Sequence, residues 1–111
     1  MPSIKLETSA VITKEQEHTL ALEIAKFAAE QLNKPLSVVQ VRIQSGITVT
    51  FGDNSESGSA FLHIALIGEI AQETKAALPE KFAAILEKYG IDRNRLFLHY
   101  TETGYGSWGW L

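Results

Sequence analysis

The chain has 111 residues, of which 45% are hydrophobic and 21% are charged, a composition typical of a single globular domain over residues 1–111. Its 13 acidic and 10 basic residues are scattered, so no basic run favours nucleic acid as a partner. Cysteine is absent, which excludes disulfides, thiolate catalysis and cysteine-based metal sites.

Residues 2–44 carry the pattern of a strand, a helix and a second strand. Apolar and polar residues alternate over residues 2–8, and this period predicts a half-buried strand. Thr13 and Gln16 form the pattern of a capping box, and apolar residues at helical spacing predict a helix as far as Asn33. Lys34-Pro35 ends that helix, because a residue before proline avoids the helical region. Alternation over residues 38–44 predicts the second strand.

Residues 47–102 continue with a further strand and then repeat the first order. Residues 47–51 alternate again and predict a short strand, and residues 52–59 form a polar loop rich in turn formers. A mostly apolar strand over 60–67, a helix over 71–89 and an alternating strand over 95–102 follow. Pro79 lies inside the helical stretch, so we expect a kink or a restart of the helix there.

The two β-α-β units agree in order and length, which indicates an internal pseudo-repeat. Right-handed units that share one sheet place both helices on the same face. The predicted fold is therefore α+β, a four-stranded mixed sheet with two helices on one face, plus short extra strands. The other face carries mostly uncharged polar residues such as Gln40 and Thr48, and the chain ends in aromatic residues, which together favour an oligomer.

The start of the chain, Met1-Pro2-Ser3-Ile4, has no basic leader followed by an apolar stretch, and no later apolar run is long enough to cross a membrane. We therefore expect a cytoplasmic protein without a membrane partner. Methionine aminopeptidases remove the initiator methionine when a small residue such as Pro2 follows it. We expect Met1 to be removed and the ring nitrogen of Pro2 to become a free secondary amine.

Histidines are the remaining candidates for acid–base or metal chemistry. His18, His63 and His99 are not at metal-ligand spacing, so the sequence predicts neither a metal site nor a cofactor. We interpret His18 as a solvated helix residue and His63 as a strand residue of unknown partner. His99 shares a strand face with Phe97 and Thr101, and it either touches a ligand or has a structural hydrogen-bonding role. No serine-nucleophile motif or phosphate-binding glycine loop is present.

Several short segments form a characteristic pattern, in their order and in their spacing, over nearly the whole chain. They are Pro2-Ser3-Ile4, Asn33-Lys34-Pro35, Thr50-Phe51-Gly52 with Ser55-Glu56, Ile67-Gly68-Glu69-Ile70, Ile91-Asp92-Arg93-Asn94-Arg95 and Trp108-Gly109-Trp110. Together they resemble the macrophage migration inhibitory factor (MIF) family of the tautomerase superfamily. The resemblance implies a homotrimer whose sheets surround a central channel, with an active site at each subunit boundary. By analogy with that family, secretion by a non-classical route is an alternative to a cytoplasmic location.

The resemblance also implies roles for residues of one subunit. Pro2 would be the general base, Lys34 would bind the carboxylate of the substrate, and the backbone amide of Ile67 would contact the ligand. Trp108 and Trp110 would form apolar walls of the pocket.

Two more site residues, Phe97 and His99, would come from the neighbouring subunit. They stand where tyrosine and asparagine are common in the family, so the polar groups offered to the substrate differ. The Cys-x-x-Cys of vertebrate members is missing, so the resemblance does not extend to thiol oxidoreductase activity.

The sequence therefore favours a keto-enol tautomerase of small aromatic α-keto acids of the phenylpyruvate type, with no cofactor. A terminal amine has an ordinary pKa of about 7.7–8.0, and burial beside Lys34 lowers it, so Pro2 can accept a proton near neutral pH. The main alternative is a MIF-like signalling or protein-binding homologue with weak or no tautomerase activity. A hydratase or dehalogenase is a third hypothesis, for which Arg42 is the one well-placed arginine.

Overall fold

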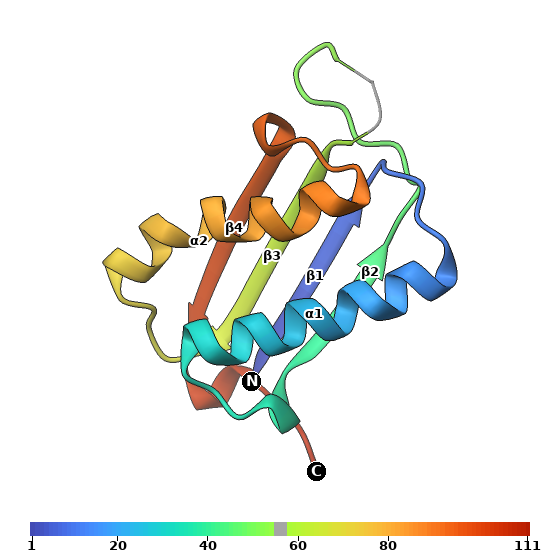
Figure 1. The fold of residues 1–111 in the computed structure, drawn as a ribbon. Coiled ribbons are helices and arrows are strands. Elements are labelled where there is room, and N and C mark those ends of the chain that lie inside the picture. Colours follow the sequence, from blue (N-terminus) through green and yellow to red (C-terminus); the bar gives the residue numbers. More distant parts are fainter. Residues whose placement is uncertain (55–57) are drawn as a thin grey trace.

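The strands and main helices follow the order β-α-β-β-α-β in a computed structural model that describes residues 1–54 and 58–111 (Figure 1). The strands are β1 (Pro2–Thr8), β2 (Gln40–Gln44), β3 (Ala60–Ile67) and β4 (Leu96–Thr103), and the helices are α1 (Lys14–Leu32) and α2 (Gln72–Leu86). Short 3-10 helices are η1 (Leu36–Val38), η2 (Glu87–Tyr89), η3 (Arg93–Arg95) and η4 (Tyr105–Ser107).

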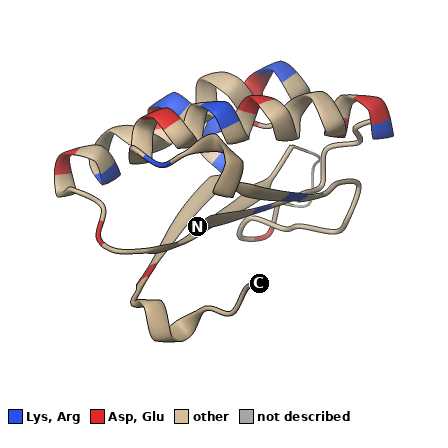
Figure 2. Ribbon diagram, turned by 90° about the horizontal axis from the view of Figure 1, so that it is seen from below, with Lys and Arg blue, Asp and Glu red and all other residues tan. Residues whose placement is uncertain are grey.

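The four strands form one mixed sheet in the order β2-β1-β3-β4. β1 is parallel to β2, β3 is parallel to β4, and the two central strands, β1 and β3, are antiparallel to each other. Both helices cover one face of the sheet, and the C-terminal segment leaves on the other side (Figure 2). The predicted pair of β-α-β units with helices on one face is confirmed. We call the helix-free side the open face.

The core lies between the sheet and the two helices. Alternate residues of β1 point into it, and Ile4 and Leu6 are completely buried, as the period of two predicted. Leu20 and Ile24 of α1 pack against these residues from the helix side of the sheet. The two helices contact each other through aromatic rings, since Phe27 packs edge-on against the buried Phe82 with ring centroids 5.0 Å apart.

Both ends of α1 follow the local signals in the sequence. The Thr13 side chain accepts a hydrogen bond from the Gln16 amide at 3.1 Å, and the Gln16 side chain accepts one from the Thr13 amide at 3.0 Å. This is the expected capping box. At the other end Asn33 takes the left-handed conformation with φ 54°, which terminates the helix. The turn places Lys34 at the end of the sheet where β1 begins.

Some predicted boundaries were wrong. Residues 47–51 form no strand within the described chain, where only an isolated bridge joins Phe51 to Asn54. The alternation is present, but β2 is the edge of the sheet and no strand of the described chain pairs beyond it. The second helix is also shorter than 71–89, because it tightens into η2 after Leu86. Ser55 and Glu56, part of the family-like pattern, lie outside the described residues.

Pro79 does not interrupt α2, which continues as one helix from Gln72 to Leu86, so the expected restart is absent. A proline has no amide hydrogen, so it cannot donate to the carbonyl four residues earlier, that of Lys75. The Tyr100 hydroxyl of β4 donates to that carbonyl at 3.1 Å. The strand beneath the helix thus supplies the missing donor, which explains how the helix tolerates a proline in its interior.

We expect Tyr100→Phe to lower the free energy of unfolding by about 1 kcal/mol, because it removes one hydrogen bond to a helix carbonyl. In a Pro79→Ala background the new amide hydrogen can reach the Lys75 carbonyl. Tyr100→Phe should therefore lower the free energy of unfolding by clearly less in that background. Urea unfolding of the four proteins measures this as a double-mutant cycle. An equal cost of Tyr100→Phe in both backgrounds would contradict the compensation.

Candidate active site

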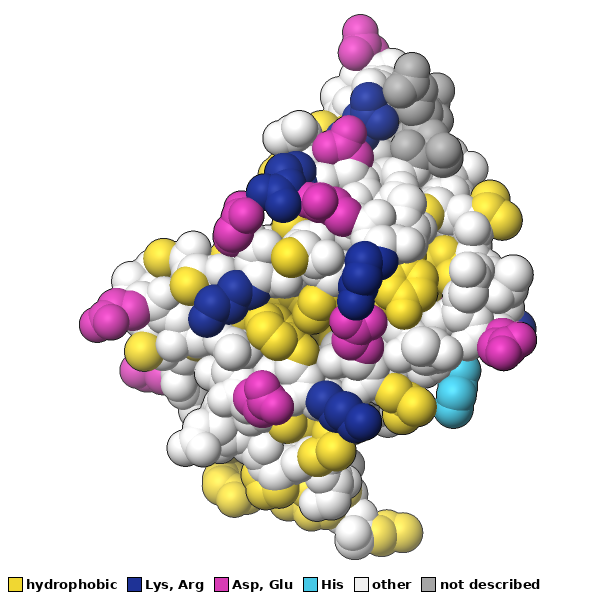
Figure 3. Space-filling model, in the orientation of Figure 1, with side chains coloured by type: hydrophobic (Ala, Val, Ile, Leu, Met, Phe, Trp, Pro, Cys, Tyr) yellow, Lys and Arg dark blue, Asp and Glu magenta, His cyan; other side chains and the backbone are white. Residues whose placement is uncertain are grey.

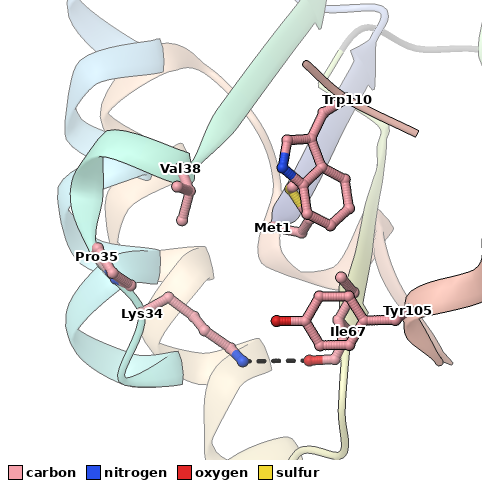
Figure 4. A pocket seen from close by; sticks show the side chains of 7 residues that line it. All are labelled: Met1, Lys34, Pro35, Val38, Ile67, Tyr105 and Trp110. Carbon is pink, nitrogen blue, oxygen red and sulfur yellow. Dashed lines mark hydrogen bonds between the residues drawn. The ribbon is translucent and has the colours of Figure 1, made fainter. Parts of the chain in front are cut away.

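The N-terminus lies beside a hollow at the end of the sheet, which we call the terminal pocket (Figure 4). It has a volume of about 260 Å³, and its lining comes from the chain start, the turn after α1, the end of β3 and the C-terminal segment: Met1, Lys34, Pro35, Val38, Ile67, Tyr105 and Trp110. Apart from the terminal amine and the Lys34 ammonium, these side chains are apolar or aromatic. Such a lining suits a small ligand with an apolar body and a negative end.

Pro2 lies directly behind Met1, as the first residue of β1. It is buried and pairs with Leu66 of the antiparallel strand β3. Pro2 also lines a second hollow of about 240 Å³, which shares Met1, Val38 and Trp110 with the terminal pocket. Removal of Met1 would therefore expose the nitrogen of Pro2 where the two hollows meet.

Lys34 reaches across the pocket from the turn after α1. Its ammonium donates to the Ile67 carbonyl at 3.2 Å (Figure 4). An ammonium has three donors, so this bond orients Lys34 and leaves donors for an anion. Partial burial, and then the positive charge of Lys34, lower the pKa of the Met1 terminal amine. The amine is therefore more easily neutral than an ordinary chain terminus.

The C-terminal segment is fixed to the sheet by a short chain of hydrogen bonds. The Trp108 indole donates to the Thr103 hydroxyl at 2.6 Å, and that hydroxyl donates to the Leu66 carbonyl at 2.6 Å. Leu66 is the partner of Pro2 in the sheet. Thr103 thus holds the segment that carries Trp110 against the same strand pair that holds Pro2.

Sequence reasoning missed Val38, Thr103 and Tyr105. Val38 lies in η1 and Tyr105 in η4, and both are exposed aromatic or apolar residues at the pocket. The Tyr105 ring lies 5.9 Å from that of Trp110, and its hydroxyl points into the pocket (Figure 4). Val38 was included in the strand predicted over 38–44, but it ends η1 and β2 begins only at Gln40. Thr103 ends β4, just beyond the strand predicted over 95–102, and Tyr105 stands in a short 3-10 helix without periodicity. Apolar side chains gather at this end of the molecule in the surface view as well (Figure 3).

Phe97 and His99 do not join this group. Neither occurs among the described residues that line the two hollows at the N-terminus. Both point to the open face from β4, and Phe97 is 59% exposed. Phe97 instead packs on Phe51 with ring centroids 4.9 Å apart, beside a third hollow of about 240 Å³. Within one chain the predicted site is therefore divided into Pro2, Lys34, Ile67 and the tryptophans on one side, and Phe97 with His99 on another.

The structure also bears on the predictions for Arg42, for metal binding and for membrane-spanning helices. Arg42 lies on β2 and is not a lining residue of the terminal pocket, so the structure gives no support to a hydratase or dehalogenase site that uses it. Over residues 1–54 and 58–111, no group of three histidine or acidic side chains is arranged to hold a metal ion. In the same part of the chain, neither helix combines the length and apolar character that crossing a bilayer requires.

A profile of the macrophage migration inhibitory factor (MIF) family matches residues 1–110. The chain belongs to the MIF family. The match includes the N-terminal proline, the Lys34 turn and the C-terminal tryptophans. A sequence search of curated proteins found no match.

Solved MIF structures have the same fold. The homologue from Toxoplasma gondii is 27% identical with a TM-score of 0.89, over 97% of this chain and 95% of that one. The MIF-like protein from Entamoeba histolytica is 26% identical with a TM-score of 0.88, over 98% and 94%. The homologue from Prochlorococcus marinus is 24% identical with a TM-score of 0.89, over 98% and 95%. These comparisons show a shared backbone fold at low sequence identity.

We expect Lys34→Gln to raise the pKa of the terminal amine, because it removes a cation that disfavours the protonated form. An NMR titration of the amine over pH 5 to 10 measures this shift. Lys26→Gln, which removes an exposed charge from α1, is the matched control and should leave the titration unchanged. An amine that titrates identically in Lys34→Gln would show that the two groups are not coupled.

Proposed function

We propose that the protein is a cofactor-independent keto-enol tautomerase of small aromatic α-keto acids of the phenylpyruvate type. The observation that carries the proposal is the position of the chain terminus, next to one cation in a largely apolar hollow. The MIF family match supports it. The substrate class follows from the lining, since Lys34 suits a carboxylate and Trp110 and Tyr105 suit an aromatic ring.

The proposed reaction is a proton transfer by Pro2 after removal of Met1. In the enol direction, the neutral ring nitrogen takes a proton from the carbon next to the keto group. The electron pair of that C–H bond forms the carbon–carbon double bond, and the keto oxygen takes up a proton. Lys34 holds the carboxylate, and its charge also keeps the amine neutral. The apolar walls limit water, which strengthens both effects.

We propose further that the site is completed by a neighbouring subunit in a homotrimer. The division between Pro2 and Phe97 within one chain is what such an arrangement requires. Ile47 and Val49 are half-buried and belong to no strand of the described chain, although the Ile47 amide donates to the Thr8 carbonyl at 3.2 Å. Such residues beside the edge strand are suited to packing at a subunit boundary.

A MIF-like binding or signalling role with little catalysis is the second candidate. It is favoured by Phe97 and His99, because a phenyl ring offers the substrate no hydroxyl where tyrosine is common in the family. Turnover of the natural chain separates the two proposals. If phenylpyruvate is not turned over, although Met1 is removed and the trimer forms, the binding role prevails.

Pro2→Gly should lower kcat/KM for phenylpyruvate by about 100-fold or more, the usual contribution of a positioned base. A glycine inserted between Met1 and Pro2 should have a similar effect, because Pro2 then has no free amine. Ser3→Ala is the matched control, with the terminus intact and the rate expected to be unchanged. Intact-mass spectrometry must show that Met1 is removed. Full activity of either terminal variant would contradict the role of Pro2.

Two inactive variants should restore activity to each other if the site is shared. Pro2→Gly keeps Phe97 and His99, and a Phe97→Ala/His99→Ala double variant keeps Pro2. When the two variants are unfolded, mixed and refolded, some subunit boundaries combine an intact Pro2 from one subunit with intact Phe97 and His99 from the next. We expect measurable tautomerase activity in the mixture and native mass spectra that show trimers. Mixed trimers without recovered activity would contradict the shared site.

A further inference from the structure

Among the described residues that line the terminal pocket, Tyr105 is the one that carries a hydroxyl. Besides it, Lys34 and Trp110 are the described lining residues with a nitrogen in the side chain. The Lys34 ammonium already donates to the Ile67 carbonyl at 3.2 Å. The indole nitrogen of Trp110 lies on the side of its ring that faces Val38 (Figure 4). The Tyr105 hydroxyl extends into the pocket from the side opposite Lys34, so the two groups face the same space from opposite walls (Figure 4).

The position of Tyr105 is fixed by the turn that carries it. In η4 the Ser107 amide donates to the Gly104 carbonyl at 3.1 Å, and the Trp108 amide donates to the Tyr105 carbonyl at 3.2 Å. The indole of Trp108 anchors this turn to the sheet. The Tyr105 ring lies beside that of Trp110 at an interplanar angle of 39°. The hydroxyl therefore has a defined place at the pocket, although the side chain is 73% exposed in the single chain.

The Tyr105 hydroxyl has no hydrogen-bond partner in the part of the chain that the structure describes, in contrast to the other two tyrosines. The Tyr100 hydroxyl donates to the Lys75 carbonyl at 3.1 Å. The Tyr89 hydroxyl donates to a Glu23 carboxylate oxygen at 3.4 Å. A phenolic hydroxyl both donates and accepts a hydrogen bond, so that of Tyr105 is available to a ligand in the pocket.

An aromatic α-keto acid presents its keto oxygen between the two groups that the proposed reaction uses. The keto carbon is bonded to the carboxylate carbon on one side and to the carbon that loses the proton on the other. Lys34 would hold the carboxylate and Pro2 would take the proton, so the keto oxygen projects from the segment between them. This oxygen gains negative charge as the C–H bond breaks, and a donor directed at it lowers the barrier. Pro2 must be neutral to take the proton, so the donor has to be a further group.

We propose that Tyr105 is a catalytic residue that donates a hydrogen bond to the keto oxygen. The inference rests on the proposed tautomerase function and adds the group that handles the oxygen. As Pro2 takes the proton, the C–H electron pair forms the carbon–carbon double bond and one C=O pair moves onto oxygen. That oxygen takes the hydroxyl proton of Tyr105. The phenolate then regains a proton from water, and Pro2 releases its own proton to water.

Tyr105→Phe removes the hydroxyl and keeps the ring. We expect it to lower kcat for phenylpyruvate about tenfold or more and to change KM less than about twofold, since the bond strengthens as charge develops on the oxygen. Tyr105→Leu, which also removes the ring, should raise KM as well. Tyr89→Phe removes the same atom from a residue that does not line the pocket, and as the matched control it should keep both constants. A natural kcat in Tyr105→Phe would overturn the proposal.

A pair of unreactive acids tests the same contact without turnover. Phenyllactate carries an oxygen on the carbon next to the carboxylate and phenylpropanoate does not, although both have the carboxylate and the ring. In calorimetric titrations Tyr105→Phe should weaken phenyllactate about fivefold, the effect of one hydrogen bond, and phenylpropanoate less than about twofold. Lys34→Gln should weaken both, because both carboxylates lose their cation. Equal weakening of the two acids by Tyr105→Phe would place the hydroxyl at the carboxylate and overturn the proposal.

The two measurements separate the role of Tyr105 from the tautomerase function. Turnover by the natural chain with an unchanged kcat in Tyr105→Phe would leave the role of Pro2 in place and overturn that of Tyr105. If the natural chain does not turn over phenylpyruvate, a weakening confined to phenyllactate would keep Tyr105 as the residue that binds the oxygen and overturn the tautomerase function. Binding of neither acid by the natural chain would overturn the role of Tyr105 as well. Intact-mass spectrometry and circular dichroism confirm that each protein has lost Met1 and is folded.

Discussion

The position of β1 in the centre of the sheet is the constraint on which the rest of the site depends. β1 begins at Pro2 and is held on both sides, by β2 and by β3. Because β1 and β3 are antiparallel, the first residue of β1 lies beside the end of β3. Because β4 is parallel to β3, the chain also leaves β4 at this end, and the turn after α1 arrives there too. One end of the sheet thus collects the terminus, Lys34, Ile67 and the C-terminal segment.

This arrangement gives a chain terminus an unusual degree of order. Most termini are mobile because nothing holds them. Here Pro2 is a paired and buried strand residue, while the residue before it lines a hollow. The amine in this position is that of Met1, and partial burial and then the charge of Lys34 lower its pKa. The proposed removal of Met1 would place the nitrogen of Pro2 next to the same hollow.

The two faces of the sheet differ in their chemistry. The helix side is completely apolar at its centre, where Ile4, Leu6 and Ile64 are buried, and supplies the stability of the domain. The open face contributes little to that core. It carries basic residues such as Lys5 and His63 in its middle and Phe97 on the edge strand β4. The two faces alternate residue by residue, which is why open-face residues and core residues are interleaved in the sequence.

The sequence by itself determined the order of the elements, the capped first helix, the mixed sheet with helices on one face and, through resemblance, Pro2, Lys34 and Ile67 as neighbours. These features depend on local periodicity, capping residues and short motifs, which a sequence displays directly. It did not predict that Tyr100 supports Pro79, that Thr103 anchors Trp108, or that Lys5, Arg42, His63 and His99 stand in one row. Only the tertiary structure decided these, because each depends on the register between strands and helices far apart in the chain. The strand expected over residues 47–51 failed for the same reason, since a strand needs a partner and alternation alone does not supply one.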